Sequence, residues 1–112
     1  MVSRLRCFIG GILFCFFTSS FALHATEQAY LLRAKILSER GEAKSALTDL
    51  NSALRLVPNH RLALKDRGDL LCRLGQYDMA KIDYNHLLRM DTRSQSAFMG
   101  LARVEAHTGQ PV

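Results

Sequence analysis

The chain has 112 residues, with 15 Lys and Arg against 10 Asp and Glu and a formal net charge of +5 at pH 7. That length suffices for one small domain, near the lower limit for a stable hydrophobic core. The charge is mildly basic and forms no clustered basic stripe, so nucleic acid is not expected as a partner.

The first 25 residues differ from the rest of the chain. A basic end at Arg4 and Arg6 precedes an unbroken apolar run, Cys7–Phe17, and small residues follow at Ala22 and Ala25. A basic region, an apolar stretch of this length and small residues after it are typical of a secretory signal peptide. We therefore predict a signal peptide over residues 1–25, cleaved after Ala22 or after Ala25.

An uncleaved membrane anchor and a buried helix are the alternatives for this segment. An eleven-residue helix reaches only about 16 Å, roughly half the thickness of a hydrocarbon core. Cleavage would leave a chain with no membrane contact, located in the endoplasmic-reticulum lumen, outside the cell, or in the periplasm of a bacterium. It would also leave Cys72 as the one cysteine, which excludes an intramolecular disulfide.

The remainder of the chain repeats itself with a period of 34 residues. Nine residue pairs at this separation are identical: Ala29/Ala63, Arg33/Arg67, Leu37/Leu71, Gly41/Gly75, Ala46/Ala80, Asp49/Asp83, Asn51/Asn85, Leu54/Leu88 and Arg55/Arg89. Self-similarity at a fixed period in this range predicts a solenoid of stacked supersecondary units.

Apolar residues recur at helical spacing in each unit and predict five helices, over residues 27–40, 43–56, 61–74, 77–90 and 96–107. Thr26 is the expected N-cap of the first helix, and Thr92–Gln95 fits a capping box before the last. Gly41 and Gly75 are expected to end the first helix of each unit. Turns this short make the paired helices antiparallel.

These residues resemble the tetratricopeptide repeat family. The second unit carries the pattern in Leu64, Gly68, Leu71, Gly75, Tyr77, Ala80, Tyr84, Leu87 and Leu88, and the first in Tyr30, Ala34, Leu37, Gly41, Ala46, Leu50, Ala53 and Pro58. The resemblance implies an all-α, antiparallel helix-pair solenoid over residues 27–110, with repeats 27–60 and 61–94 and a partial repeat 95–110. The departures are Arg33 and Arg67 at a usual leucine, Ala43 at an aromatic and Thr92 at a proline.

The resemblance also implies where a partner would bind. The family's concave face is lined by the first helix of each unit, which maps here to Leu31, Lys35, Leu62, Lys65, Asp69, Arg73, Met99 and Arg103, with Gln28, Ser38, Cys72 and Ser96 beside them. Four cations, one acid and three apolar residues among the first eight suit an extended peptide of some acidic character. The alternative is that these are only the solvated faces of amphipathic helices.

No catalytic or metal-binding constellation emerges. His60, His86 and His107 have no ligand partner at a recognised metal spacing, and Cys72 is expected to pack as a small apolar residue rather than to act as a nucleophile. We therefore expect a non-enzymatic protein with neither cofactor nor metal.

Two subtypes of the family bear on which class of partner is expected. The clamp for acidic chaperone tails needs Lys and Asn residues where this chain has Leu31, Lys35, Asp66, Met99 and Gly100, so that clamp is absent. A signal peptide joined to these repeats is similar instead to luminal co-chaperones that hold unfolded chains. No J-domain or retention signal accompanies the repeats here.

The last predicted helix lacks a partner helix. We expect Phe98, Leu101 and Val104 to exceed what one neighbouring face can cover, which suggests a piece of a longer array, self-association or a marginal domain. The leading hypothesis is a secretory-pathway scaffold that binds peptide segments. The alternative is a structural module that acts by self-stacking or within a longer array.

Overall fold

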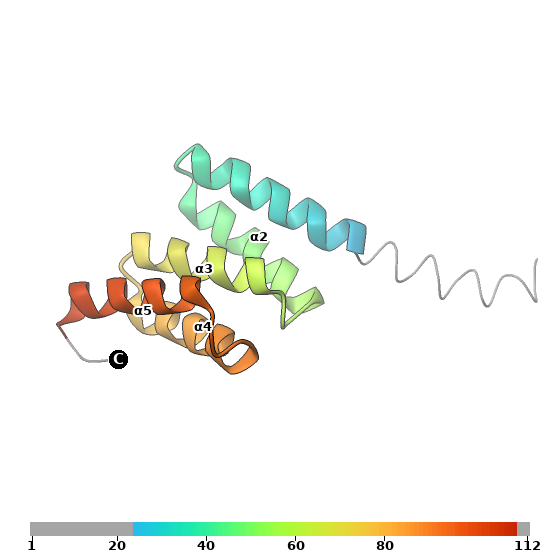
Figure 1. Ribbon diagram of the computed structural model, residues 1–112. Helices are drawn as coiled ribbons and strands as arrows, with labels where there is room; N and C mark the ends of the chain where they lie inside the picture. Colours follow the sequence, from blue (N-terminus) through green and yellow to red (C-terminus); the bar gives the residue numbers. More distant parts are fainter. Residues whose placement is uncertain (1–23, 110–112) are drawn as a thin grey trace, which may run out of the picture.

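The computed structural model describes residues 24–109, and these residues form five helices and no strand (Figure 1). The first helix covers residues 24–39. It is followed by α2 (Ala43–Leu56), α3 (Arg61–Arg73), α4 (Tyr77–Met90) and α5 (Gln95–Thr108). The predicted bounds of α2 and α4 are confirmed. Helix α3 ends one residue earlier than predicted, α5 is one residue longer at each end, and the first helix begins and ends earlier than the predicted 27–40. Residues 1–23, which hold almost all of the predicted signal peptide, lie outside the described range.

Glycines end the first helix of each unit, as predicted. Gly41, Gly75 and Gly109 have φ values of 81°, 76° and 68°. The amide of Gln76 donates to the carbonyl of Leu71 at 2.8 Å, and that of Gly75 donates to Cys72 at 3.1 Å. This pair of bonds is a Schellman motif, which needs a left-handed residue and therefore favours glycine.

Two predicted caps are wrong. Residues 24 and 25 are already helical, so Thr26 lies inside the first helix rather than at its N-cap. Helix α5 is capped by Ser94, whose Oγ accepts from the amide of Ala97 at 3.4 Å. The start predicted at Thr92 fails because the Asp91 carboxylate accepts from the amide of Arg93 and holds a turn there.

His60 joins the starts of two helices. Its Nδ1 accepts from the amide of Ala63 at 3.1 Å and so caps α3. Its Nε2 lies 2.7 Å from the carboxylate of Glu27, a residue of the first helix that is only 3% exposed. The ring therefore ties the first helix to α3 at one end of the molecule.

The core is centred on α3, which contacts α2, α4 and α5. Helix α4 contributes Tyr84, the largest of the fully buried side chains. Its ring lies against Gly68 of α3 and Gly100 of α5, where a Cβ atom would collide with it. Both glycines therefore leave the space that one aromatic ring occupies between the two helices.

Each helix pair also contains an arginine–aspartate pair. Arg33 donates from Nε and Nη2 to Asp49 at 2.6 Å, and Arg67 donates in the same way to Asp83 at 2.7 and 2.6 Å. Both aspartates are buried. The two arginines that depart from the family's usual leucine are thus explained, because each neutralises a buried carboxylate on the helix that follows it.

The terminal helix is better covered than the sequence led us to expect. Leu101 and Val104 are 6% and 3% exposed, so the expectation that they lack cover is wrong. They pack into the hydrophobic core that α3 and α4 share. Only Phe98 of that trio is exposed, at 54%. Within residues 24–109, no helix combines the length and apolarity needed to cross a bilayer.

Candidate functional site

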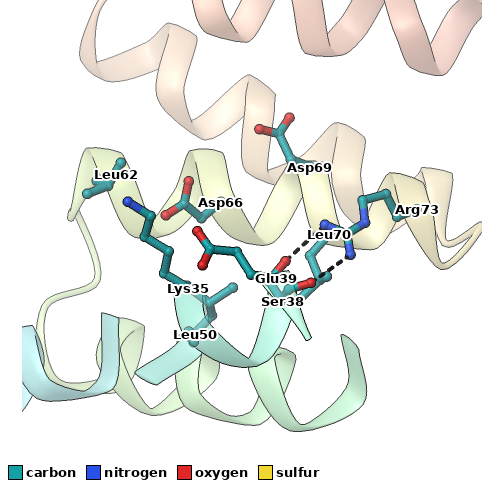
Figure 2. Close-up of a pocket in the computed structure, with 10 residues that line it drawn as sticks. Lys35, Ser38, Glu39, Leu50, Leu62, Asp66, Asp69, Leu70 and Arg73 are labelled. Atoms are coloured by element: carbon teal, nitrogen blue, oxygen red, sulfur yellow. Dashed lines mark hydrogen bonds between the residues drawn. The ribbon is translucent and has the colours of Figure 1, made fainter. Parts of the chain in front are cut away.

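A hollow of about 420 Å³ opens between the first helix and α3 (Figure 2). Its apolar lining comes from Ala34, Leu50, Leu62 and Leu70, of which Leu62 is half-exposed and the others are buried. Its polar lining comes from Lys35, Ser38, Glu39, Asp66, Asp69 and Arg73. An apolar base with a few polar groups around it is the usual make-up of a ligand site.

One end of this first hollow is closed by Arg73. The Arg73 guanidinium donates to Ser38 Oγ at 2.9 Å and to the Ser38 carbonyl at 3.4 Å, and so crosses from α3 to the first helix. Figure 2 shows both bonds at the end of the hollow opposite Leu62. Arg73 thus links α3 to the first helix at this end of the hollow.

Asp69 of α3 gathers three donors. The Tyr84 hydroxyl donates to its carboxylate at 2.6 Å, Lys65 Nζ at 3.0 Å and Arg103 Nη1 at 3.2 Å. Burial alone would raise the pKa of Asp69, but the hydrogen bonds from Tyr84 and Lys65 outweigh it and hold that pKa below its usual value. Burial, with the Asp69 carboxylate adding to it, raises the pKa of Tyr84. The carboxylate is therefore ionised at neutral pH and accepts from three donors.

Two other carboxylates of the first hollow are differently placed. Figure 2 shows Glu39 on the first helix and Asp66 on α3, with the carboxylate of Asp69 pointing away from both. Neither Glu39 nor Asp66 accepts a hydrogen bond from another described residue. Asp66 forms a long ion pair with Lys65, whose Nζ lies 3.8 Å from the Asp66 carboxylate. Burial raises the pKa of Asp66 even though Lys65 and Lys35 oppose that shift.

A second hollow of about 450 Å³ lies where α3 begins, α4 ends and α5 begins. Leu62 lines it as well, so that side chain is the ridge between the two hollows. The charged residues of this second hollow are Arg61, Lys65, Arg93 and Asp91, and the hydroxyls of Ser94 and Ser96 lie beside them. Its charge is therefore predominantly positive.

The structure brings together most of the residues predicted for the groove. Lys35, Leu62, Asp69 and Arg73 line the first hollow, and Leu62 and Lys65 line the second. Arg103 lies beside them through its bond to Asp69. Met99 is 59% exposed but lines neither hollow.

Two residues predicted for the binding face line neither hollow. Leu31 packs against the hydrophobic core, and Cys72 is buried with its Sγ 3.9 Å from the Tyr84 hydroxyl. Burial raises the pKa of the Cys72 thiol, which keeps it neutral and a poor nucleophile.

Sequence reasoning overlooked Glu39, Arg61 and Arg93 as site residues. Helical spacing could have found the first, because Glu39 lies four residues after Lys35 on the same helical face. Arg61 and Arg93 flank turns, and only the stacking of the units brings them to one hollow. The sequence marks Asp66 only as a departure from the clamp for acidic chaperone tails.

The histidines have structural partners. His60 caps α3, His86 lies 2.9 Å from Asn59 Oδ1, and His107 stacks on Tyr77 with ring centroids 5.3 Å apart. Among residues 24–109, no group of three or more His, Cys, Asp or Glu side chains is placed to hold a metal ion.

The fold has a close counterpart among solved structures. A tetratricopeptide repeat protein from Parabacteroides merdae superimposes with a TM-score of 0.73 and 28% sequence identity, over 95% of this chain and 43% of that one. A mouse (Mus musculus) protein, DnaJ homolog subfamily C member 3, is 33% identical over 67 residues.

That match takes in 60% of this chain and 13% of the mouse protein, so the chain spans only a small part of its relative. No protein-family profile matches the sequence. The fold is nevertheless defined by the structural counterpart and by the helix order. The described chain is an all-α solenoid of the tetratricopeptide type, with two antiparallel helix pairs and a fifth helix.

Proposed function

We propose that this chain is a non-enzymatic interaction scaffold of the secretory pathway, which holds an extended peptide in the groove formed by the two hollows. The observation that carries the proposal is the first hollow, with its apolar base, polar lining and half-exposed Leu62. Covering the exposed Leu62 side chain with an apolar group of a partner would remove apolar surface from water and so stabilise the complex. Helix-pair solenoids commonly bind along this face.

The charge of the groove modifies the partner expected from the sequence. Of the four predicted cations, Lys65 and Arg103 bind Asp69 and Arg73 binds Ser38. Only Lys35 has no hydrogen bond or ion pair within the described residues. An acidic peptide would therefore have to displace internal partners, whereas an unfolded segment with an apolar side chain would meet Leu62 directly.

The proposed location rests on the signal-peptide pattern of residues 1–25, and the co-chaperone-like role on the match to a DnaJ homolog. Edman sequencing of the protein purified separately from the cells and from their medium tests the location and the cleavage. A mature end at Leu23 or Thr26 supports the proposal, and an intact Met1 contradicts cleavage.

A reduced, carboxymethylated polypeptide is a suitable probe of peptide binding. Leu62→Ser should weaken its binding severalfold, because the substitution removes the apolar ridge of the groove. Ile82→Ser is the matched control, since Ile82 is a comparably exposed residue of α4 that lines neither hollow. Equal loss in both variants would show that the probe binds any exposed apolar residue and would contradict the groove.

The alternative is an assembly module, and exposed apolar residues on the terminal helices favour it. Positions 36, 70 and 104 are equivalent in the repeat; Leu70 and Val104 are buried, whereas Ile36 is 40% exposed. Phe98 is exposed on α5. Phe98→Ser should lower the oligomeric state in sedimentation experiments under this alternative and leave it unchanged under the first. Met79→Ser, at an exposed position of α4, is the control.

A further inference from the structure

The charges that line the first hollow balance one another. Two cations and two carboxylates of its lining offset each other: Lys35, Arg73, Glu39 and Asp66. Arg73 keeps its charge, because its hydrogen bonds go to the neutral hydroxyl and carbonyl of Ser38. The remaining carboxylate, that of Asp69, already accepts from two cations and a hydroxyl. The first hollow therefore offers a ligand its apolar base rather than a net charge.

The second hollow has an excess of positive charge. Three cations and one acid line it: Arg61, Lys65, Arg93 and Asp91. Lys65 shares the Asp69 carboxylate with a second cation, Arg103, so that carboxylate offsets only one of the two. The Asp91 carboxylate accepts from the backbone amide of Arg93 at 3.0 Å and is held at its own turn.

Two of these cations are free to meet a ligand. The side chains of Arg61 and Arg93 are exposed, and their guanidinium groups make no hydrogen bond or ion pair within residues 24–109. An acidic group can thus enter the second hollow without displacing an internal partner, as it could not at Arg73 or Arg103.

Resting on the proposed peptide-binding function, we propose that the groove takes a peptide whose apolar side chain enters the neutral first hollow and whose acidic side chain enters the second. Leu62 lines both hollows, so the peptide backbone between these two side chains would pass over it. Arg61 and Arg93 are then the residues that select an acidic partner. Neither belongs to the positions at which the related repeats hold acidic chaperone tails.

The lining of the second hollow suits a carboxylate in particular. The planar guanidinium group of an arginine donates two parallel hydrogen bonds to a carboxylate, and both Arg61 and Arg93 can do so. The Ser94 and Ser96 hydroxyls lie 3.2 Å apart, and one proton suffices for the bond between them, which leaves the other for a ligand. Leu87 supplies apolar contact for the stem of a glutamate. A lysine of the peptide would meet like charges there.

The test uses three capped peptides of the form Z-Gly-Leu-Gly-Z, in which Z is Glu, Gln or Lys. The symmetric sequence presents Z to the second hollow in either chain direction. Binding is followed by amide chemical shifts in NMR spectra of the ¹⁵N-labelled chain. At low salt the Glu peptide should bind about threefold to fivefold more tightly than the Gln peptide, and the Lys peptide most weakly. These differences should vanish in 1 M NaCl, where charges are screened over about 3 Å.

A fourth peptide tests the apolar half of the arrangement. Replacing its leucine, as in Glu-Gly-Ser-Gly-Glu, should weaken binding about tenfold, because the side chain that enters the first hollow is lost. Equal binding of the leucine and serine peptides would show that the acidic residues bind alone and would overturn the inference.

Protein variants then assign the preference to the second hollow. Arg61→Glu with Arg93→Glu should transfer it from the Glu peptide to the Lys peptide, a gain that only a folded protein can show. An acid at position 61 falls in the first turn of α3, where negative charge is favourable. Arg40→Glu with Arg89→Glu is the matched control, since it changes the net charge equally at exposed arginines that line neither hollow. A transfer in the control as well would make net charge the cause and overturn the inference.

The outcomes separate this inference from the proposed function. If the Glu, Gln and Lys peptides bind equally and shift the amides of Leu62 and its neighbours, the groove binds peptides without selecting an acidic residue, and the inference is overturned alone. If none of the peptides binds, both the inference and the proposed function are overturned.

Discussion

The hydroxyl of Tyr84 donates to Asp69 at 2.6 Å, although Tyr84 belongs to α4 and Asp69 faces the groove on α3. Tyr84 is fully buried, hydroxyl included, while Asp69 lines the first hollow. A core residue and a surface residue are therefore one unit, and a change in either is felt by the other.

Tyr84→Phe should lower the free energy of unfolding by about 1–2 kcal/mol, because it removes a hydrogen bond to a charged group while Lys65 and Arg103 remain. Urea denaturation at pH 7 measures this. The pKa of Asp69 is lowered in the folded state, so its contribution is present at neutral pH and is lost as the pH falls through the folded pKa, below about pH 4. The variant should lose less stability than wild type on that descent. An identical acid profile would contradict the bond.

Gly100→Ala should destabilise the chain by about 1–3 kcal/mol, because the added methyl group collides with the Tyr84 ring. Thermal denaturation followed by circular dichroism measures the loss. Tyr84→Leu in the same chain should recover part of it by vacating that space. Gly68→Ala should show a smaller loss, since its Cβ would lie 2.8 Å from the nearest ring atom and the approach at Gly100 is closer. A neutral Gly100→Ala would show that the ring has room to move.

Arg67→Ala should cost about 3–5 kcal/mol, because it leaves Asp83, which is 2% exposed, as an unpaired buried carboxylate. The double variant Arg67→Leu with Asp83→Leu should recover most of the loss, since an apolar pair has no charge to bury. Chemical denaturation of the two variants side by side measures the difference. If the double variant were less stable than the single one, the cost would lie in packing rather than in charge.

Gly75→Ala should lower stability by about 1–2 kcal/mol through the backbone alone, because φ is 76° and nothing lies within 4 Å of the added Cβ. Gly75→Asn should cost less, since asparagine tolerates the left-handed conformation better. Denaturant titration of both variants tests the order. Equal losses would assign the effect to the side chain rather than to φ.

Helix positions were readable from the sequence because they depend on local rules. The glycines at 41 and 75 and the apolar spacing set the bounds of α2 and α4 correctly. The cap at Thr26 was misplaced because residues 24 and 25 are already helical. A threonine can cap a helix but can also lie within one, so its presence alone does not mark the start. Thr92 and Ser94 offered the same hydroxyl, and the turn held by Asp91 decided between them.

The groove was only partly readable because its chemistry depends on contacts between units. Arg103 and Asp69 are 34 residues apart, and their bond removes a cation that the sequence offers to a ligand. Arg73 reaches Ser38 across 35 residues with the same result. A pattern along one helix predicts which side chains share a face, but it does not predict which of them satisfy one another.

The ring of Tyr84, held between Gly68 and Gly100, also has a mechanical consequence. It acts as an incompressible spacer that sets the distance between α3 and α5, with no side chain on either glycine to yield. On the other side of α3, the first helix is joined to it at the groove by the hydrogen bonds between Arg73 and Ser38, which are exposed to water. Any widening of the groove for a bulky residue must therefore come from the first helix, so ligand size is selected on one side and accommodated on the other.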